Sequence, residues 1–239
     1  MAARPDAAEK RRAPLTRERV LRAAVELADE RGIEALTMRN LGQELGVEAM
    51  SLYNHVANKE AVLDGIVEVV VDEVLAAVDE IEKPSVPAEW KDVMRRRILA
   101  AREVLLRHRW APGVLESRTS MPPTLLRYYD ALLGLMREAG FSIDLAHHAM
   151  HALGSRALGF SQELFVTDDE DVEPEMAAVM LRQMAGYPHL MELMRVVNHD
   201  ADSTLGGCDD QFEFEFGLDL LLDGLERLRA AAWQLPDGT

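Results

Sequence analysis

Apolar and polar residues recur with a helical period along almost the whole chain, most regularly in the segment at 58–81. Its apolar residues share one arc of a helical wheel, while Glu60, Asp64 and Glu68 line the opposite side. The run VEVVV at 67–71 would suit a strand by composition. Two segregated faces over the full segment nevertheless favour one long amphipathic helix.

Capping residues and glycines divide the chain into further helices. A Thr or Asn side chain caps the first N–H groups of a helix, and glycine accepts the left-handed conformation that ends one. The predicted boundaries are Thr16 and Gly32 for the first helix, Thr37 and Gly46 for the second, about 48 and 55 for the third, and Asn58 for the start of the long helix. Later helices are expected at 88–109, 123–139, 142–166, 174–186, 188–200 and 209–233.

The last predicted helix, at 209–233, is apolar on more than one side. A helix of this kind has to be covered on two sides, so we expect one side to meet its own domain and the other to meet a second subunit. The expected homodimer interface consists of residues spaced four and three apart, namely Phe214, Leu218, Leu221 and Leu225. A core helix covered entirely by its own chain is the alternative.

The composition indicates a protein with a sizeable core and no membrane partner. The chain has 239 residues, of which 48% are hydrophobic, enough for one or two domains. It has no uncharged apolar window of about 18 residues, and its first residues, MAARPDAAEKRRAP, lack the apolar segment of a secretory signal. Cys208 is the single cysteine, which excludes a disulfide framework within one chain. We therefore expect a cytoplasmic protein.

The formal net charge of −16 is unevenly distributed. Residues 1–60 contain ten basic and ten acidic side chains, so the remainder carries the whole negative excess. Charges in salt solution are screened within about 8–10 Å, which makes local charge decisive for contact with DNA. The acidic composition therefore does not exclude DNA binding.

Residues 37–59, TMRNLGQELGVEAMSLYNHVANK, have the pattern of a helix-turn-helix. Two short helices are joined by a tight turn in which Gly46 supplies a left-handed conformation at little steric cost. Gly42 has no side chain and lets the two helices approach closely. The exposed face of the third helix carries polar and apolar side chains that suit base edges and phosphates in a major groove. An ordinary helical hairpin is the alternative on spacing alone.

The stretch from Thr16 to Leu63, above all LGVEAMSLYNHVANKEAVLD, resembles the tetracycline-repressor (TetR) family of bacterial transcriptional regulators. FGLDLLLDGLERL at 216–228 looks like the C-terminal domain of the branch that contains the tetracycline repressor itself. The resemblance implies an all-helical homodimer whose N-terminal heads read a palindromic operator in double-stranded DNA. It also implies that a small-molecule inducer in each C-terminal domain alters the spacing of the heads and releases the DNA.

The resemblance also assigns residues to the DNA. Carried over by position, Arg39, Ala49, Met50, Ser51, Tyr53, His55 and Lys59 fall where that branch contacts DNA. Ala49 and Met50 depart from a polar residue followed by proline, so the base preference should differ. Tyr53, His55 and Lys59 suit phosphate contacts.

The predicted ligand-binding domain differs more from the tetracycline-repressor branch than the DNA-binding head does. Leu75 stands where the repressor has a ligand-binding histidine, and residues 111–118 contain no histidine, so tetracycline is not expected as the inducer. The family layout places a ligand pocket among the helices at 88–109, 123–139 and 142–166. Its expected lining residues are Met94, Leu115, Tyr128, Met150 and Phe160. Methionines of the body suit an adaptable cavity or ordinary core packing equally.

Other functional classes are disfavoured. His147 and His151 share a helix face, as metal ligands often do, but no third ligand at a suitable spacing completes the site. We therefore interpret them as surface or core histidines. A metal or ligand role is the alternative. Ser155 lacks the strand that a nucleophile elbow needs. No phosphate-binding glycine motif is present. We expect no cofactor, no metal and no enzymatic activity.

The sequence thus predicts an all-α protein with a three-helix helix-turn-helix head and a larger helical domain for ligand binding and dimerisation. The expected division is a flexible basic arm at 1–13, a DNA-binding domain at 14–60 and a ligand-binding and dimerisation domain at 61–235. Its predicted function is that of a ligand-responsive transcriptional regulator, most simply a repressor. The alternative is a small-molecule-binding or scaffold protein with a vestigial head.

Overall fold

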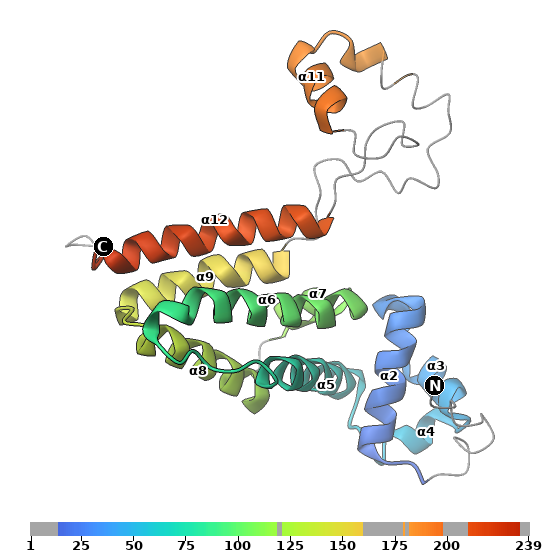
Figure 1. The fold of residues 1–239 in the computed structure, drawn as a ribbon. Helices are drawn as coiled ribbons and strands as arrows, with labels where there is room; N and C mark the ends of the chain where they lie inside the picture. Colours follow the sequence, from blue (N-terminus) through green and yellow to red (C-terminus); the bar gives the residue numbers. More distant parts are fainter. Residues whose placement is uncertain (1–13, 119–120, 160–178, 180–181, 198–209, 235–239) are drawn as a thin grey trace, which may run out of the picture. The chain divides into compact units, whose positions relative to one another are not determined.

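The regular elements of the described chain are all helices (Figure 1). The computed structural model describes residues 14–118, 121–159, 179, 182–197 and 210–234. Packing divides the chain into one compact unit of Met1–Met150 with Leu228–Thr239, and a second of His151–Arg227. No helix among the described residues is long and apolar enough to span a membrane. The predicted all-α fold is confirmed.

Among the described residues, the first three α-helices form a small head that packs on a long fourth helix. They are α2 (Arg17–Arg31), α3 (Met38–Leu45) and α4 (Ala49–Leu52), followed by α5 (Lys59–Asp79), with a short 3₁₀ turn at Ile33–Ala35. The three predicted caps are confirmed, because the side chains of Thr16, Thr37 and Asn58 accept hydrogen bonds from the backbone N–H groups three residues later.

The residues after α5, called the body below, contain further helices. They are α6 (Trp90–Arg107), which follows a 3₁₀ turn at Pro87–Glu89, then α7 (Ala111–Glu116), α8 (Pro123–Glu138), α9 (Ile143–Gly159), α11 (Pro188–Val197) and α12 (Asp210–Ala230). The helix α7 was not predicted, because no helix was expected between 109 and 123. Pro112 lies in the first turn of α7, where its missing N–H leaves no hydrogen bond unmade. The helix expected at 174–186 lies largely outside the described residues.

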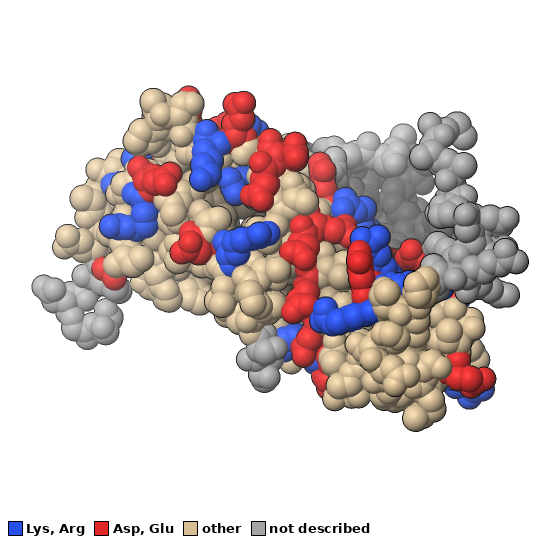
Figure 2. Space-filling view, turned by 90° about the horizontal axis from the view of Figure 1, so that it is seen from below, with Lys and Arg blue, Asp and Glu red and all other residues tan. Residues whose placement is uncertain are grey.

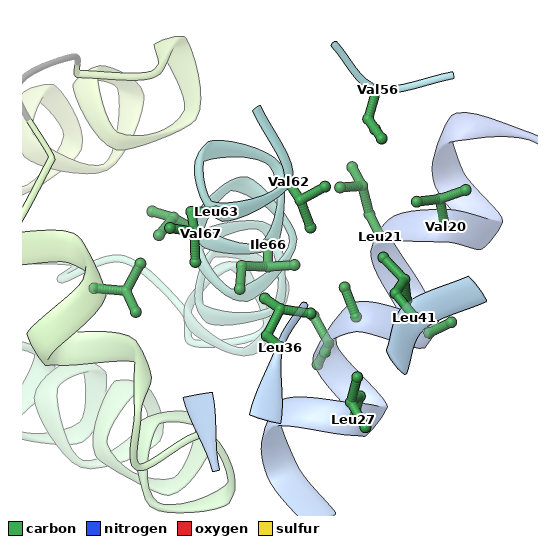
Figure 3. Close-up of a cluster of buried hydrophobic side chains, with 14 of the residues drawn as sticks. Val20, Leu21, Leu27, Leu36, Leu41, Val56, Val62, Leu63, Ile66 and Val67 are labelled. Atoms are coloured by element: carbon green, nitrogen blue, oxygen red, sulfur yellow. The ribbon is translucent and has the colours of Figure 1, made fainter. Parts of the chain in front are cut away.

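One hydrophobic core joins the head to the N-terminal half of α5 (Figure 3). Its buried members on the head include Val20, Leu21, Leu27, Leu41, Leu45, Leu52 and Val56, and those on α5 include Val62, Leu63, Ile66 and Val67. Each buried aliphatic side chain of this size contributes about 1.5–3 kcal/mol. The head is therefore anchored to α5 by apolar packing rather than by exposed ion pairs.

A second core forms farther along the same helix. Val70, Val74 and Val78 of α5 pack with Ala101 and Val104 of α6 and with Ala111 of α7. Trp110 and Tyr128 lie against both cores. The helix α5 therefore belongs to the core of the head at its start and to the core of the body farther along.

Candidate nucleic-acid interface

The turn between α3 and α4 has the geometry of a helix-turn-helix. Gly46 adopts a left-handed conformation with φ of 69° and ψ of 33°, and its N–H donates to the carbonyl oxygens at 42 and 43. A Cβ atom added to Gly42 would lie 2.9 Å from the carbonyl oxygen of Val47 and 3.2 Å from the backbone nitrogen of Ala49. Both predicted glycine roles are confirmed, because a side chain at 42 would separate the two helices.

The segment after this turn has one side buried and the other exposed. Leu52 and Val56 are buried in the head core. Met50 is 75% exposed and Tyr53 is 44% exposed, whereas Ala49, Ser51 and His55 are partly buried. The exposed side is therefore accessible to a duplex, and the buried side holds it in place.

The helix at this position is shorter than predicted. The expected helix at 48–55 is one turn, Ala49–Leu52, and the chain continues as a turn through residues 53–55. Hydrogen bonds from the N–H groups of His55 and Val56 to the carbonyl oxygen of Leu52 keep that turn compact. Tyr53 and His55 therefore project from a turn at the end of α4 rather than from a continuous helix.

Two basic residues, one on the head and one at the start of α5, are available for an external anion. Basic side chains lie beside acidic ones over much of the face in Figure 2, and Arg17, Arg22 and Arg31 pair with carboxylates. By contrast, the side chains of Arg39 and Lys59 are exposed and have no ion pair with another described residue. Lys59 is also the first residue of α5, where the helix N-terminus favours negative charge.

A polar cluster connects the head to the body. Nδ1 of His108, after α6, lies 2.8 Å from Oδ1 of Asp29 on α2, and Nε2 lies 3.2 Å from a carboxylate oxygen of Glu73 on α5. The indole N–H of Trp110 donates to the same oxygen of Asp29 at 2.7 Å. The side chain of His108 is only 7% exposed. The buried ring of His108 therefore joins three helical segments at one point.

Glu73 is held in its ionised form within this cluster. Burial raises the pKa of Glu73, but hydrogen bonds and charge from His108 and Arg107 outweigh that effect and leave the pKa below its ordinary value. The guanidinium of Arg107 lies 3.1 Å from the Glu73 carboxylate. The Glu73 carboxylate therefore stays ionised at neutral pH.

A second polar link reaches the start of α5. Arg118, just after α7, lies 2.6 Å from an oxygen of Glu60 and 3.4 Å from an oxygen of Asp64. The hydrogen bond to Glu60 is the main cause of a raised pKa of Arg118. Glu60 directly follows Lys59, so this contact joins the segment after α7 to the expected phosphate contact.

The expected pocket residues are only partly brought together. Leu115 and Tyr128 pack against the same core, Met94 is buried on α6, and Met150 is partly buried on α9. Phe160 lies outside the described residues. His147, His148 and His151 are exposed, and no three potential ligands among the described residues are grouped so as to hold a metal ion.

The expected dimer residues require a correction. Phe214, Leu218 and Leu225 are buried within the single chain, and Leu221 is partly buried, so the predicted stripe faces the interior. The guanidinium of Arg156 covers the ring of Phe214 at 5.1 Å from its centre. Phe212, Phe216 and Leu220 are each more than half exposed. The regular spacing correctly identified an apolar stripe, but it could not say which stripe its own chain covers.

Two family models match the chain. "Bacterial regulatory proteins, tetR family" matches residues 20–66, and "Tetracyclin repressor-like, C-terminal domain" matches residues 83–229. The chain is similar to the tetracycline repressor protein class D of Escherichia coli, with 32% identity over 229 residues that cover 95% of this chain and 96% of the relative. The first model thus spans the head and the start of α5, and the second spans the body.

Solved structures resemble the chain over most of its length. One is a possible TetR family transcriptional regulator from Streptomyces coelicolor A3(2), with 31% identity, a TM-score of 0.69 and coverage of 89% of this chain and 99% of that one. Another is the Streptomyces coelicolor protein ActR in complex with (S)-DNPA, with 26% identity, a TM-score of 0.66 and coverage of 92% and 100%. Both comparisons extend from the head into the body.

Proposed function

This chain belongs to the tetR family of bacterial regulatory proteins, and we propose that it represses transcription by binding a palindromic operator as a homodimer until a small-molecule inducer releases it. One observation carries this proposal. The segment from Ala49 to His55 exposes its outer side chains while Leu52 and Val56 hold its inner side in the head core. A segment held in this way can enter a major groove without unfolding the head.

The exposed residues divide into two roles. Arg39, Ala49, Met50 and Ser51 would face base edges, where a guanidinium can bind guanine bidentately and an apolar side chain can touch a thymine methyl group. Tyr53, His55 and Lys59 would bind phosphates, with the start of α5 adding its favourable dipole. The first group would set the operator sequence, and the second would set the affinity for duplex DNA in general.

A second copy of the chain would cover the exposed apolar side of α12. Phe212, Phe216 and Leu220 lie four residues apart and so share one face of this helix. A large exposed apolar strip is characteristic of a protein interface. Dimerisation through it would present two heads to half-sites about 34–36 Å apart, one turn of the duplex.

The inducer would bind in the body and act on the head through α5. The proposed division remains an arm at 1–13, a DNA-binding domain at 14–60 and a ligand-binding and dimerisation domain at 61–235. The structure of ActR with (S)-DNPA is that of a family member holding a small molecule, which supports a ligand-binding body here. The contacts of His108 and Arg118 with α2 and α5 offer the physical connection.

An inducer acts by binding one of two conformations of the protein more tightly than the other. An inducer must favour the released conformation over the DNA-bound one by about 10⁴-fold to shift the equilibrium from 1:99 to 99:1. That preference can arise from several small changes in the packed contacts around α5. No change within the head itself is needed.

Selection of duplexes from a random-sequence pool by the purified full-length protein tests the proposal. Enrichment of an inverted repeat with half-site centres one helical turn apart would support it. A variant with Arg39, Tyr53 and Lys59 all replaced by alanine should enrich nothing. If the wild-type protein also enriches no sequence, the proposal is wrong, and a small-molecule-binding protein with a vestigial head becomes the better account.

A further inference from the structure

A buried arginine of α6 has a polar atom without a partner. Arg97 is only 6% exposed, and its Nε atom is buried with no hydrogen-bond partner. No described carboxylate forms an ion pair with it. A buried charge costs several kcal/mol unless it is paired. A cation in this position is therefore expected to serve a purpose other than stability of the isolated chain.

A second unpartnered polar atom is found on α8. The hydroxyl oxygen of Thr124, in the first turn of that helix, is buried and has no hydrogen-bond partner. Buried polar groups are nearly always hydrogen-bonded in native proteins, so an unpaired one calls for an explanation such as a bound water, ion or ligand. Arg97 and Thr124 thus provide two unused hydrogen-bonding groups in the same compact unit.

Tyr128 links these two groups. It lies four residues after Thr124 and so on the same face of α8. Tyr128 packs against the core cluster that contains Ala101, and Ala101 lies one turn after Arg97 on the same face of α6. Burial raises the pKa of Tyr128 to about 12, and the positive charge of Arg97 opposes that rise. A phenol with this pKa is neutral at pH 7. It cannot neutralise Arg97, but it can donate a hydrogen bond.

The surroundings on α6 are apolar. Met94 and Ile98, one turn before Arg97 and directly after it, are both buried. The neighbouring Arg96 differs, because it is exposed and bonds to Asp92 at 3.0 Å. Arg102 is also buried, but it interacts with another group of the chain. Among these three arginines of α6, Arg97 alone combines burial with an unpartnered nitrogen.

We propose that Arg97 and Thr124, assisted by the Tyr128 hydroxyl, bind the oxyanion of an otherwise apolar inducer. The inducer would carry a carboxylate, a sulfonate or an acidic phenolate on an apolar ring system, because a guanidinium pairs best with planar or multiply oxygenated anions. This inference rests on the proposed function, since it specifies the chemical class of ligand that the body binds.

Two matched fluorescent probes test the inference on the full-length protein. 8-Anilinonaphthalene-1-sulfonate carries an anion, and N-phenyl-1-naphthylamine has the same ring system without it. Fluorescence titrations give the dissociation constant of each probe for the wild type, for Arg97→Met and for Arg97→Lys. Arg96→Gln is the control, because it removes an adjacent arginine that is already paired and exposed.

The expected result is selective. A hydrogen bond to a charged group contributes about 1.5–3 kcal/mol, so Arg97→Met should weaken binding of the sulfonate by roughly 10- to 150-fold. It should change binding of the neutral probe less than about twofold. Arg97→Lys should retain part of the affinity, Thr124→Val should lose a smaller part, and Arg96→Gln should match the wild type.

The stability of the variants distinguishes a ligand site from a structural role. Because Arg97 is buried and unpaired, Arg97→Met should raise the melting temperature in the absence of a probe. Equal loss of both probes, unchanged sulfonate binding in Arg97→Met, or no preference of the wild type for the sulfonate would overturn the inference. The two hypotheses can fail separately. Failure to select an operator would count against the proposed function, whereas the probe titrations test the anion site whether or not an operator is found.

Discussion

His108 and Asp29 lie 79 residues apart in the sequence, yet Nδ1 of the histidine is 2.8 Å from the carboxylate of the aspartate. Asp29 belongs to α2 in the head, and His108 ends α6 in the body. Because the Asp29 carboxylate also accepts the indole N–H of Trp110, one carboxylate on the head holds two donors from the body. This contact therefore joins the two parts through polar groups.

Removal of the Asp29 carboxylate should weaken the fold at this contact. Asp29→Ala would leave the Trp110 indole N–H and the His108 ring without their partner, at an expected cost of about 1–3 kcal/mol in the free energy of unfolding. Chemical denaturation measures this change. Glu30→Ala, at an exposed acidic residue on the same helix, should stay within about 0.5 kcal/mol of the wild type. Equal effects of the two substitutions would show that the contact contributes nothing.

Glu73 makes stability depend on pH in the acid range. Its pKa in the folded chain is lower than the ordinary value of 4.5, so its contribution is complete above that value and is lost as the pH falls through the folded pKa. The difference in unfolding free energy between the wild type and Glu73→Gln should therefore be constant near neutral pH and shrink below about pH 4.5. A difference that grows on acidification would contradict this assignment.

Phosphate contacts should affect all DNA sequences alike. Lys59→Ala should weaken binding to the operator and to unrelated duplexes by a similar factor, and should reduce the slope of log K against log salt by about one. Tyr53→Phe should also weaken both, without changing the slope. Fluorescence anisotropy at several salt concentrations measures these effects. Arg96→Ala, on α6 in the body, is the control, and an unaltered slope in Lys59→Ala would argue against phosphate binding.

Base readout should affect sequence preference instead. Arg39→Ala and Ser51→Ala should each reduce discrimination between the preferred base and other bases at one position of each half-site. For Arg39, a bidentate contact with a base would contribute about 1–3 kcal/mol to that discrimination. Repeating the duplex selection with each variant reveals the altered position. A variant that enriches the wild-type sequence with unchanged stringency would remove that residue from the set of base contacts.

The exposed side of α12 should mediate dimerisation. Phe216→Glu would place a charge in the proposed interface and should produce monomers with poor operator affinity, because two linked heads bind far more tightly than one. Leu126→Glu is the matched control, since Leu126 is an equally exposed leucine on α8. Analytical ultracentrifugation measures the association state, and a dimer of unchanged strength in Phe216→Glu would exclude this interface.

Local structure was predictable where a single residue determines the backbone. Thr16, Thr37 and Asn58 cap their helices as expected, and Gly46 has the left-handed conformation that the turn requires. Each prediction depends on an interaction within a few residues of sequence. The helix α7 was not predicted. Pro112 is compatible with the first turn of a helix as well as with a break, so the local sequence does not decide between them.

Long-range contacts were not predictable from the pattern. Phe214 and Phe216 are two residues apart and equally apolar, yet Phe214 is buried and Phe216 is exposed, because the packing of other helices decides which side is covered. Arg97 is one of several arginines in α6, and only its position in the fold distinguishes it from Arg96. His108 gave no signal, because its partners Asp29 and Glu73 come from distant segments.

The central claim is that this head reads a DNA sequence. The most direct test compares the affinity of the full-length protein for its selected inverted repeat with that for a duplex of the same length and composition in scrambled order, at physiological salt. We expect the inverted repeat to bind at least about 10³-fold more tightly, as specific regulators do. Equal affinity for both duplexes would contradict the account.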